Sequence, residues 1–162
     1  MKRLENKKVI ITGAGNGIGR GIAKSVGLQG AKVAICATRT KTLSETKRIL
    51  EEHNISVFSK IVDVRNEDEI IAFVKESAEF MGGINVLINN AAVMPSTHLE
   101  SLTADTIDYI LNVNLRAPIL LTREVVPYMK KEDVGSINIR TLSWSSIKSA
   151  YSYDASDSLR LA

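Results

Sequence analysis

The stretch TGAGNGIG, Thr12 to Gly19, follows directly on the apolar run Val9-Ile10-Ile11 and opens a segment, Ile18 to Leu28, whose apolar residues recur at helical spacing. A buried strand that turns through glycines into a helix leaves backbone N–H groups pointing at one place, and the helix dipole adds positive potential there. Glycine permits the tight turn, lets the backbone approach a ligand, and lets the helix pack closely on the strand. The stretch therefore predicts a phosphate site.

Strand and helix patterns alternate along the chain. Short apolar runs rich in β-branched residues are separated by longer amphipathic segments, which is typical of βαβ units and of a parallel sheet covered by helices on both faces. Strands are predicted at Lys8 to Thr12, Lys32 to Ala37, Ser56 to Val62, Asn85 to Asn89 and Val134 to Ile139, and helices at Gly17 to Gln29, Lys41 to His53, Glu67 to Met81 and about Thr103 to Lys130. The expected fold class is α/β: a doubly wound, Rossmann-like parallel sheet of about five strands in three layers.

Three further motifs fall just past the ends of predicted strands, namely Thr38-Arg39, Asp63-Val64 and Asn90-Ala91. In a doubly wound sheet the ligand lies beyond the carboxyl ends of the strands, where the strand order reverses. Together with the glycine-rich stretch, these loops form a continuous trough at one edge of the sheet. Such a trough suits an extended dinucleotide better than a mononucleotide.

Four motifs stand in the same order as in a known family. They are Thr12-Gly13-x-x-x-Gly17-Ile18-Gly19; Asp63-Val64; Asn89-Asn90-Ala91-Ala92, with alanine in place of a final glycine; and Val113-Asn114-Leu115 followed by Thr122, Pro127 and Met129. From about Lys7 to about Ile139 the chain resembles the short-chain dehydrogenase/reductase family. The resemblance implies a nicotinamide-dependent oxidoreductase that acts on a small-molecule alcohol or carbonyl substrate. It implies that the cofactor is bound by Thr12, Gly13, Gly15, Asn16, Gly17, Ile18, Gly19, Thr38, Arg39, Asp63, Val64, Asn90, Ala91 and Ala92.

The choice of cofactor depends on the residues that follow the second predicted strand. An NAD site usually places an acid there for the ribose 2′-hydroxyl, whereas an NADP site places an arginine for the 2′-phosphate. This chain has Thr38 and Arg39, whose guanidinium offers a planar set of donors. NADP(H) is therefore favoured over NAD(H), although Asn16 stands where many NADP-preferring relatives carry a second basic residue. The alternative is that Arg39 is simply a solvated residue at the end of a strand.

The catalytic residues are implied only by the resemblance. The family uses a serine and a Tyr-x-x-x-Lys pair, assisted by the asparagine that matches Asn114. Tyr153 matches the tyrosine, but Asp157 stands at the lysine position. A carboxylate one helical turn away raises the pKa of a tyrosine above its usual value of roughly 10, which is the wrong direction for proton transfer. Thr141 is the best match to the serine, and Ser143 is the alternative.

After Ile139 the match to the family degrades, and the sequence ends at Ala162. We therefore expect residues 1–162 to form one dinucleotide-binding domain of a C-terminally truncated or frame-shifted family member, without the family's last strands and substrate-pocket segment. Three readings follow: an active NADP(H)-dependent oxidoreductase, a catalytically impaired nucleotide-binding module, or a marginally stable fragment. The substrate and the direction of the reaction are not encoded in any recognisable motif.

The composition limits the classes of protein to which this chain can belong. The 162 residues are 44% hydrophobic and 24% charged with a net charge of +3, which is ordinary for a globular domain. No basic stripe with interleaved aromatics indicates nucleic-acid binding, no apolar run is long enough for a membrane, and no residue cluster has metal-ligand spacing. Cys36 is the only cysteine, so a cytoplasmic protein is expected. A homodimer through the long helix around residues 103–130 is a further expectation from the resemblance.

Overall fold

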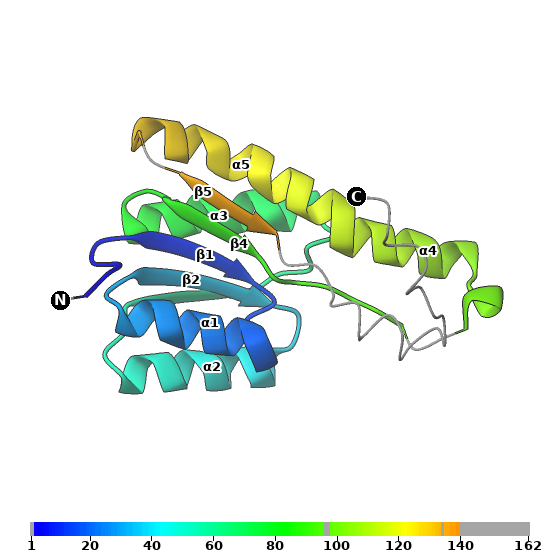
Figure 1. Cartoon of the computed structure of the whole chain (residues 1–162), viewed down its shortest axis with the longest axis horizontal. Helices are drawn as coiled ribbons and strands as arrows, with labels where there is room; N and C mark the ends of the chain where they lie inside the picture. Colours follow the sequence, from blue (N-terminus) through cyan, green and yellow to red (C-terminus); the bar gives the residue numbers. More distant parts are fainter. Residues whose placement is uncertain (1, 96–97, 134, 140–162) are drawn as a thin grey trace, which may run out of the picture.

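A parallel sheet forms the centre of the computed structural model, which describes residues 2–95, 98–133 and 135–139 (Figure 1). Within these residues the sheet has five strands in the order β3-β2-β1-β4-β5. They are β1 (Lys8–Thr12), β2 (Lys32–Ala37), β3 (Val57–Ile61), β4 (Val86–Asn89) and β5 (Ser136–Ile139). The order reverses between β1 and β4, which places a ligand-binding switch point there. The predicted doubly wound parallel sheet is confirmed.

Helices cover both faces of the sheet. Figure 1 shows α1 (Gly17–Leu28) and α2 (Thr40–Glu52) on one side and α5 (Ala117–Lys131) on the other, where α3 (Glu67–Met81) also packs. Successive side chains of a strand point to opposite faces, so Val9 and Ile11 enter the core with α1 and α2, whereas Ile10 enters the core with α3 and α5. All three side chains are buried. This alternation produces the three layers.

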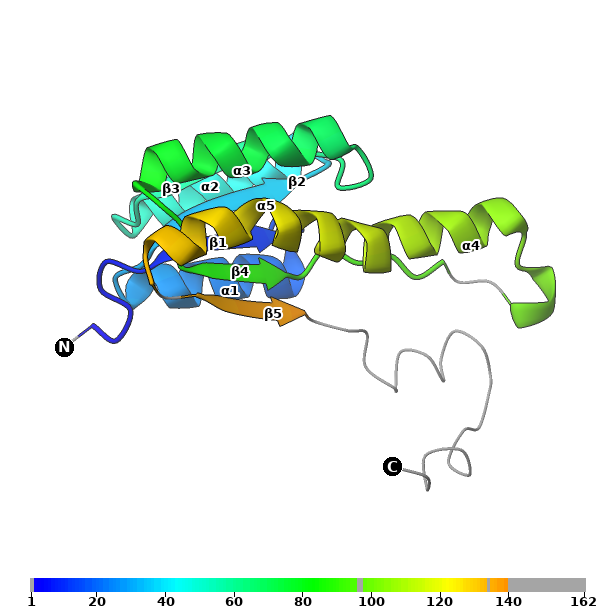
Figure 2. The same cartoon turned by 90° about the horizontal axis from the view of Figure 1, so that it is seen from above.

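One long helical segment extends past the sheet. It begins after the 3-10 turn η1 (Leu99–Ser101) and consists of α4 (Ala104–Leu111), the π-helical turn η2 (Asn112–Arg116) and α5. Thr103 caps its start, because its Oγ1 accepts a hydrogen bond from the amide of Thr106 at 3.2 Å. Figure 2 shows that α4 lies beyond the carboxyl ends of the strands. The helix predicted from Thr103 to Lys130 is therefore present, with a π turn that the sequence pattern does not reveal.

The ends of α3 follow from local chemistry. Asn66 caps its start: Oδ1 accepts from the amide of Asp68 at 3.0 Å and from that of Glu69 at 3.4 Å. Acidic residues fill the first turn, where they complement the helix dipole. Gly82 then ends the helix in the left-handed conformation, with φ of 78°. The observed bounds equal the predicted ones.

A polar cluster closes the end of the sheet opposite α4. Lys8 Nζ donates to Glu132 Oε1 at 2.8 Å and to the carbonyl of Gly82 at 2.7 Å, and Asn85 Nδ2 donates to Glu132 Oε2 at 3.4 Å. The ammonium of Lys8 holds the pKa of the Glu132 carboxyl below its usual value. These contacts join β1, the end of α3 and the end of α5. The site lies at the other end of the strands.

Candidate functional site

A pocket of about 630 Å³ lies at the carboxyl ends of the strands, around the switch point between β1 and β4. The loops after β1, β2, β3 and β4 all contribute to it, and α4 and the π turn add one residue each. It is lined by Gly13, Gly15, Asn16, Gly17, Ile18, Gly19, Cys36, Ala37, Thr38, Arg39, Thr42, Val62, Asp63, Val64, Arg65, Asn90, Ala91, Ala92, Val93, Tyr109 and Val113. Every residue predicted to bind the cofactor lines this pocket, with the exception of Thr12.

The glycines of the loop after β1 have different structural roles. Gly13 and Gly17 adopt φ of 65° and 50°, a region that side chains disfavour. A Cβ on Gly19 would lie 2.5 Å from both the carbonyl oxygen of Gly13 and Asn90 Nδ2, so only glycine lets α1 begin so close to the loop. A Cβ on Gly17 would meet nothing within 4 Å, which leaves its backbone open to a ligand. Among the described residues no side chain caps the start of α1.

Two side chains brace the middle of the same loop. The carbonyl of Gly15 accepts hydrogen bonds from Arg20 Nη2 at 2.8 Å and from Thr46 Oγ1 at 2.9 Å. Arg20 also donates from Nε to Thr46 at 2.9 Å and pairs with Glu45 at 3.0 Å. Because these groups bind the Gly15 carbonyl, the shape of the loop is fixed from the α2 side.

Asn90 and Thr12 fix the loop from the β4 side. Thr12 Oγ1 accepts from the amides of Asn90 and Ala91 at 3.1 and 3.0 Å. Asn90 Nδ2 in turn donates to the carbonyl of Thr12 at 2.9 Å and to that of Gly13 at 3.1 Å. Both side chains are buried. Thr12 therefore holds two of the loops together from beneath the pocket.

Thr38 and Arg39 form the rim of the pocket where β2 ends, and both are exposed. Three other arginines near the loops are engaged, since Arg20 pairs with Glu45, Arg65 with Asp63 and Arg116 with Glu67. None of the salt bridges among the described residues involves Arg39. Its guanidinium is thus a cation at the pocket rim that an anion can pair with.

Asp63 is held by Arg65 at the end of the pocket formed by the β3 loop. Arg65 Nε lies 3.0 Å from each carboxylate oxygen of Asp63, and the Arg65 amide donates to Oδ1 at 3.0 Å. The hydrogen bonds and charge of this guanidinium lower the pKa of the Asp63 carboxyl. The carboxyl is therefore an ionised acceptor at neutral pH.

Asn114 lies in the π turn, half-buried, and does not itself line the pocket. Its side chain pairs with the backbone of Val93: Oδ1 accepts from the amide and Nδ2 donates to the carbonyl, each at 2.9 Å. The asparagine thus fixes the segment that follows β4 against the long helix. The other predicted catalytic residues, Thr141, Ser143 and Tyr153, lie outside the described residues, as does Asp157.

Sequence reasoning did not identify the pocket residues contributed by the long helix. Tyr109 and Val113 are four apart and share a helix face, but only the position of α4 beyond the strands brings them to the pocket. Arg65 was also missed, although its position two residues after Asp63 is a usable signal. Cys36 is fully buried, and burial raises the pKa of its thiol to about 12, so it is a core residue.

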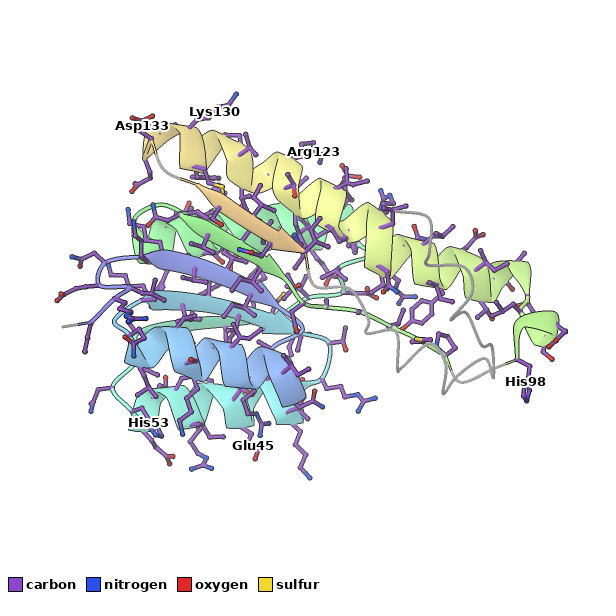
Figure 3. The ribbon with its side chains drawn as sticks, viewed as in Figure 1. Glu45, His53, His98, Arg123, Lys130 and Asp133 are labelled. Carbon is purple, nitrogen blue, oxygen red and sulfur yellow. The ribbon has the colours of Figure 1, made fainter. Side chains whose placement is uncertain are left out.

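The two histidines lie far from one another. Figure 3 labels His53 at the end of α2 and His98 at the outer end of the α4 region, on opposite sides of the molecule. Both are exposed. Their positions agree with surface roles.

None of the helices in the described ranges is both long and apolar enough to cross a bilayer.

Comparison with known proteins places this geometry in a family. The family described as short chain dehydrogenase matches residues 7–156. Dehydrogenase/reductase SDR family member 4 of Sus scrofa is 32% identical over 139 residues, which cover 85% of this chain and 50% of that protein. A solved metagenomic short-chain oxidoreductase in complex with NADP is 32% identical with a TM-score of 0.80, covering 86% of this chain and 64% of that one. NAD⁺-bound xylitol dehydrogenase shares the fold, with a TM-score of 0.80 at 23% identity, covering 84% and 53%.

The match covers only part of these relatives. This chain spans 29% of hydroxysteroid dehydrogenase-like protein 2 of Mus musculus, 50% of the Sus scrofa protein and 55% of an uncharacterized oxidoreductase of Staphylococcus saprophyticus. The residues matched by the family, 7–156, include the five strands described above and every residue that lines the pocket.

Proposed function

This chain belongs to the short-chain dehydrogenase/reductase family, and we propose that it is an NADP(H)-dependent oxidoreductase acting on an alcohol or carbonyl substrate. The observation that carries the proposal is that the four loops after β1, β2, β3 and β4 meet in one pocket. We take residues 1–162 as one dinucleotide-binding domain. The test is to titrate the purified chain with NADPH and NADH in a calorimeter, where saturable binding is expected. A well-folded chain that binds neither contradicts the proposal.

The pocket fits a dinucleotide. Its volume of about 630 Å³ lies within the usual range for cofactor sites. A Cβ on Gly13 would lie 2.8 Å from the Cα of Ala91, so the loop is already as tight as glycine allows, while Gly17 leaves its backbone exposed to an incoming group. The uncapped start of α1 supplies N–H donors and a positive dipole end for a diphosphate. These features support a phosphate cradle.

Different parts of the pocket would bind different parts of the dinucleotide. The amides of the loop from Gly13 to Gly19 would hold the diphosphate, Thr38 and Arg39 the ribose next to the base, and Asp63 and Val64 the base. Asn90, Ala91 and Ala92 would line the half that leads towards the reacting ring. When bound, the nicotinamide ring supplies or accepts the hydride exchanged with the substrate carbon.

Side chains of this protein would transfer the proton that accompanies hydride transfer. Tyr153 is proposed to exchange a proton with the substrate oxygen, and Thr141 or Ser143 to orient that oxygen by a hydrogen bond. Asn114 is proposed to support them, and its pairing with the backbone of Val93 fixes it beside the pocket wall. These assignments rest on the family resemblance of the motifs.

The proposed preference for NADP(H) is supported by the guanidinium of Arg39 at the pocket rim. Arg39 lines the pocket without a carboxylate partner among the described residues, and Thr38 adds no negative charge. A 2′-phosphate would offer such an arginine a bidentate partner. The NADP complex of the metagenomic relative supports this reading, whereas the NAD⁺-bound neighbour shares only the fold.

Arg39→Glu is expected to reverse the cofactor preference. The substituted carboxylate would repel the 2′-phosphate, so NADPH affinity should fall about 100-fold, or roughly 2.7 kcal/mol, while NADH affinity should stay within about threefold of wild type. Calorimetric titration with both dinucleotides measures this. Lys41→Glu is the matched control, because it reverses the same charge two residues away on α2 outside the pocket lining. An equal loss for both dinucleotides would show that Arg39 does not read the phosphate.

A second candidate is a nucleotide-binding module without turnover, and Asp157 at the position of the family's lysine favours it. One assay distinguishes the enzyme from the binding module. NADPH oxidation with a panel of aldehydes and ketones, beside the binding titration, gives turnover for the enzyme and binding alone for the module.

A homodimer through the long helix is part of the proposal. Ile107, Leu111, Leu115 and Ile119 recur at a spacing of four along α4, the π turn and α5, and all are exposed, Ile119 by 61%. Such an apolar stripe is costly in water and is typical of an interface. Sedimentation velocity is expected to show a dimer that Leu115→Glu converts to monomer. A wild-type monomer at the highest attainable concentration contradicts this.

A further inference from the structure

Arg20 lies in the first turn of α1 and joins the loop after β1 to α2, although it does not line the pocket. The two helices lie side by side on one face of the sheet (Figure 1). From Nη2, Arg20 donates to the Gly15 carbonyl at 2.8 Å and to Glu45 Oε2 at 3.0 Å. From Nε, it donates to Thr46 Oγ1 at 2.9 Å. An arginine reaches all three acceptors because its donors are spread over a planar fork, whereas those of a lysine share one nitrogen.

The Gly15 carbonyl uses both of its acceptor sites on these contacts. One is taken by Arg20 Nη2 and the other by Thr46 Oγ1, at 2.9 Å. The peptide bond that follows is trans and planar, so the N–H of Asn16 faces away from these two side chains. Gly15 and Asn16 both line the pocket. Arg20 and Thr46 therefore set the orientation of a loop amide without lining the pocket themselves.

Thr46 extends the same contact to the first turn of α2. Its side chain is fully buried and bonds the Thr42 carbonyl at 3.1 Å as well as the Gly15 carbonyl. The Thr42 hydroxyl in turn donates to the Arg39 carbonyl at 3.1 Å. A Cβ on Gly15 would lie 2.8 Å from Thr42 Oγ1, so the loop already packs against the helix there. The loop after β1 and the backbone of Arg39 thus belong to one hydrogen-bonded unit.

A fixed separation between this loop and Arg39 matters for a ligand that carries two phosphate groups. NADPH has a diphosphate and a 2′-phosphate on one covalent framework, so the second group gains most when the protein holds both subsites at a matching distance. NADH has no 2′-phosphate and uses only the loop. Contacts that fix the separation are therefore expected to favour NADPH over NADH.

We propose that Arg20 is a positioning residue that, through Thr46, holds the loop after β1 at a fixed distance from Arg39, so that the preference for NADP(H) depends on a side chain outside the pocket lining. The inference rests on the proposed dinucleotide site and adds a residue that sets its cofactor preference.

The test is a double-mutant cycle between Arg20 and Arg39, in which the full chain is titrated with NADPH and NADH in a calorimeter. Arg20→Met is expected to lose about 30-fold in NADPH affinity and about threefold in NADH affinity, so the preference falls about tenfold, or roughly 1.4 kcal/mol. With Arg39→Met already present there is no guanidinium at the rim to keep in place. Arg20→Met should then cost about threefold for both dinucleotides, a non-additive result that a purely structural role does not produce.

Thr46 offers a second pair of variants. Thr46→Val keeps the shape of the side chain and removes the hydroxyl, so it should lower the preference in the same direction. Thr46→Ser keeps the hydroxyl and should retain the preference. The Ala14 amide still donates to the Cys36 carbonyl at 3.0 Å in all these variants, so the start of the loop stays attached to β2. Arg20→Lys, which keeps the charge, should fall between wild type and Arg20→Met and gives the same readout if Arg20→Met does not fold.

The matched control is Arg48→Met, which removes an arginine from an exposed ion pair with Glu52 on α2, outside the pocket lining. It should leave both affinities unchanged. Two outcomes overturn the inference alone: an NADPH preference unchanged in Arg20→Met, or the same NADPH loss with and without Arg39, which would make Arg20 act independently of the rim. A wild-type chain that binds neither dinucleotide overturns the proposed function and this inference with it.

Discussion

Gly19→Ala is expected to abolish dinucleotide binding and to lower the free energy of unfolding by about 3 kcal/mol, the upper part of the range for overpacking. The new Cβ would lie 2.5 Å from the carbonyl oxygen of Gly13 and 2.9 Å from the Cα of Ala14. These are backbone atoms, so the loop or the first turn of α1 must move. Such a movement disperses the N–H groups that would converge on a diphosphate.

The control for this variant lies two residues further along the same helix. A Cβ on Gly21 would meet nothing within 4 Å, so Gly21→Ala should leave binding unchanged and raise stability by up to about 1 kcal/mol through helix propensity. Urea unfolding and NADPH titration measure both variants. If Gly19→Ala binds like wild type, the loop is not the phosphate site.

Asn90→Asp is expected to cost about 3 kcal/mol of stability at pH 7 and to weaken cofactor binding at the same time. The Asn90 amide nitrogen donates to the carbonyls of Thr12 and Gly13, and the side chain is buried. An ionised carboxylate at this position has no proton to donate and would face two carbonyl oxygens. The strand-end loop would lose its fixed shape.

The effect of Asn90→Asp should depend on pH in a defined direction. The protonated carboxyl can still donate one hydrogen bond, so its pKa in the folded variant is raised above the unfolded value of roughly 3.9. The stability deficit relative to wild type is therefore smallest below about pH 4 and grows as pH rises through the folded pKa. Urea titrations of both proteins from pH 4 to 7 measure it. Asn138→Asp makes the same substitution at an exposed position and should show neither effect; a deficit that does not change with pH would contradict the account.

Much of the fold is predictable because its signals are local. The bounds of β1, β2 and α3 agree with the sequence prediction, since buried apolar runs, the Asn66 cap and Gly82 mark them directly. The π turn at Asn112–Arg116 is not predictable in this way, because it changes the hydrogen-bond step without changing which residues are apolar. It contains Asn114, whose side chain pairs with Val93 in a contact across the fold that no local pattern indicates.

The same distinction between local signals and contacts across the fold applies to the site. Most of the pocket residues in the loops after the strands could be predicted, because the carboxyl ends of parallel strands meet at one edge whatever the details of packing. Tyr109 could not be found, since it reaches the pocket only through the path of α4 beyond the sheet. The hydrogen bonds of Thr12 were equally hidden: the sequence places it in the loop motif, and only the structure shows its hydroxyl turned towards Asn90 and Ala91.

The central position of β1 in the sheet limits how the residues around the site can move. With β2 on one side and β4 on the other, and with Val9 to Thr12 buried, the backbone amides of this strand can exchange with deuterated solvent only when the sheet itself comes apart. The glycine loop is a direct continuation of that strand. The loop that would hold the diphosphate is thus attached to the segment of the sheet expected to open last, so local opening elsewhere in the domain need not disturb it.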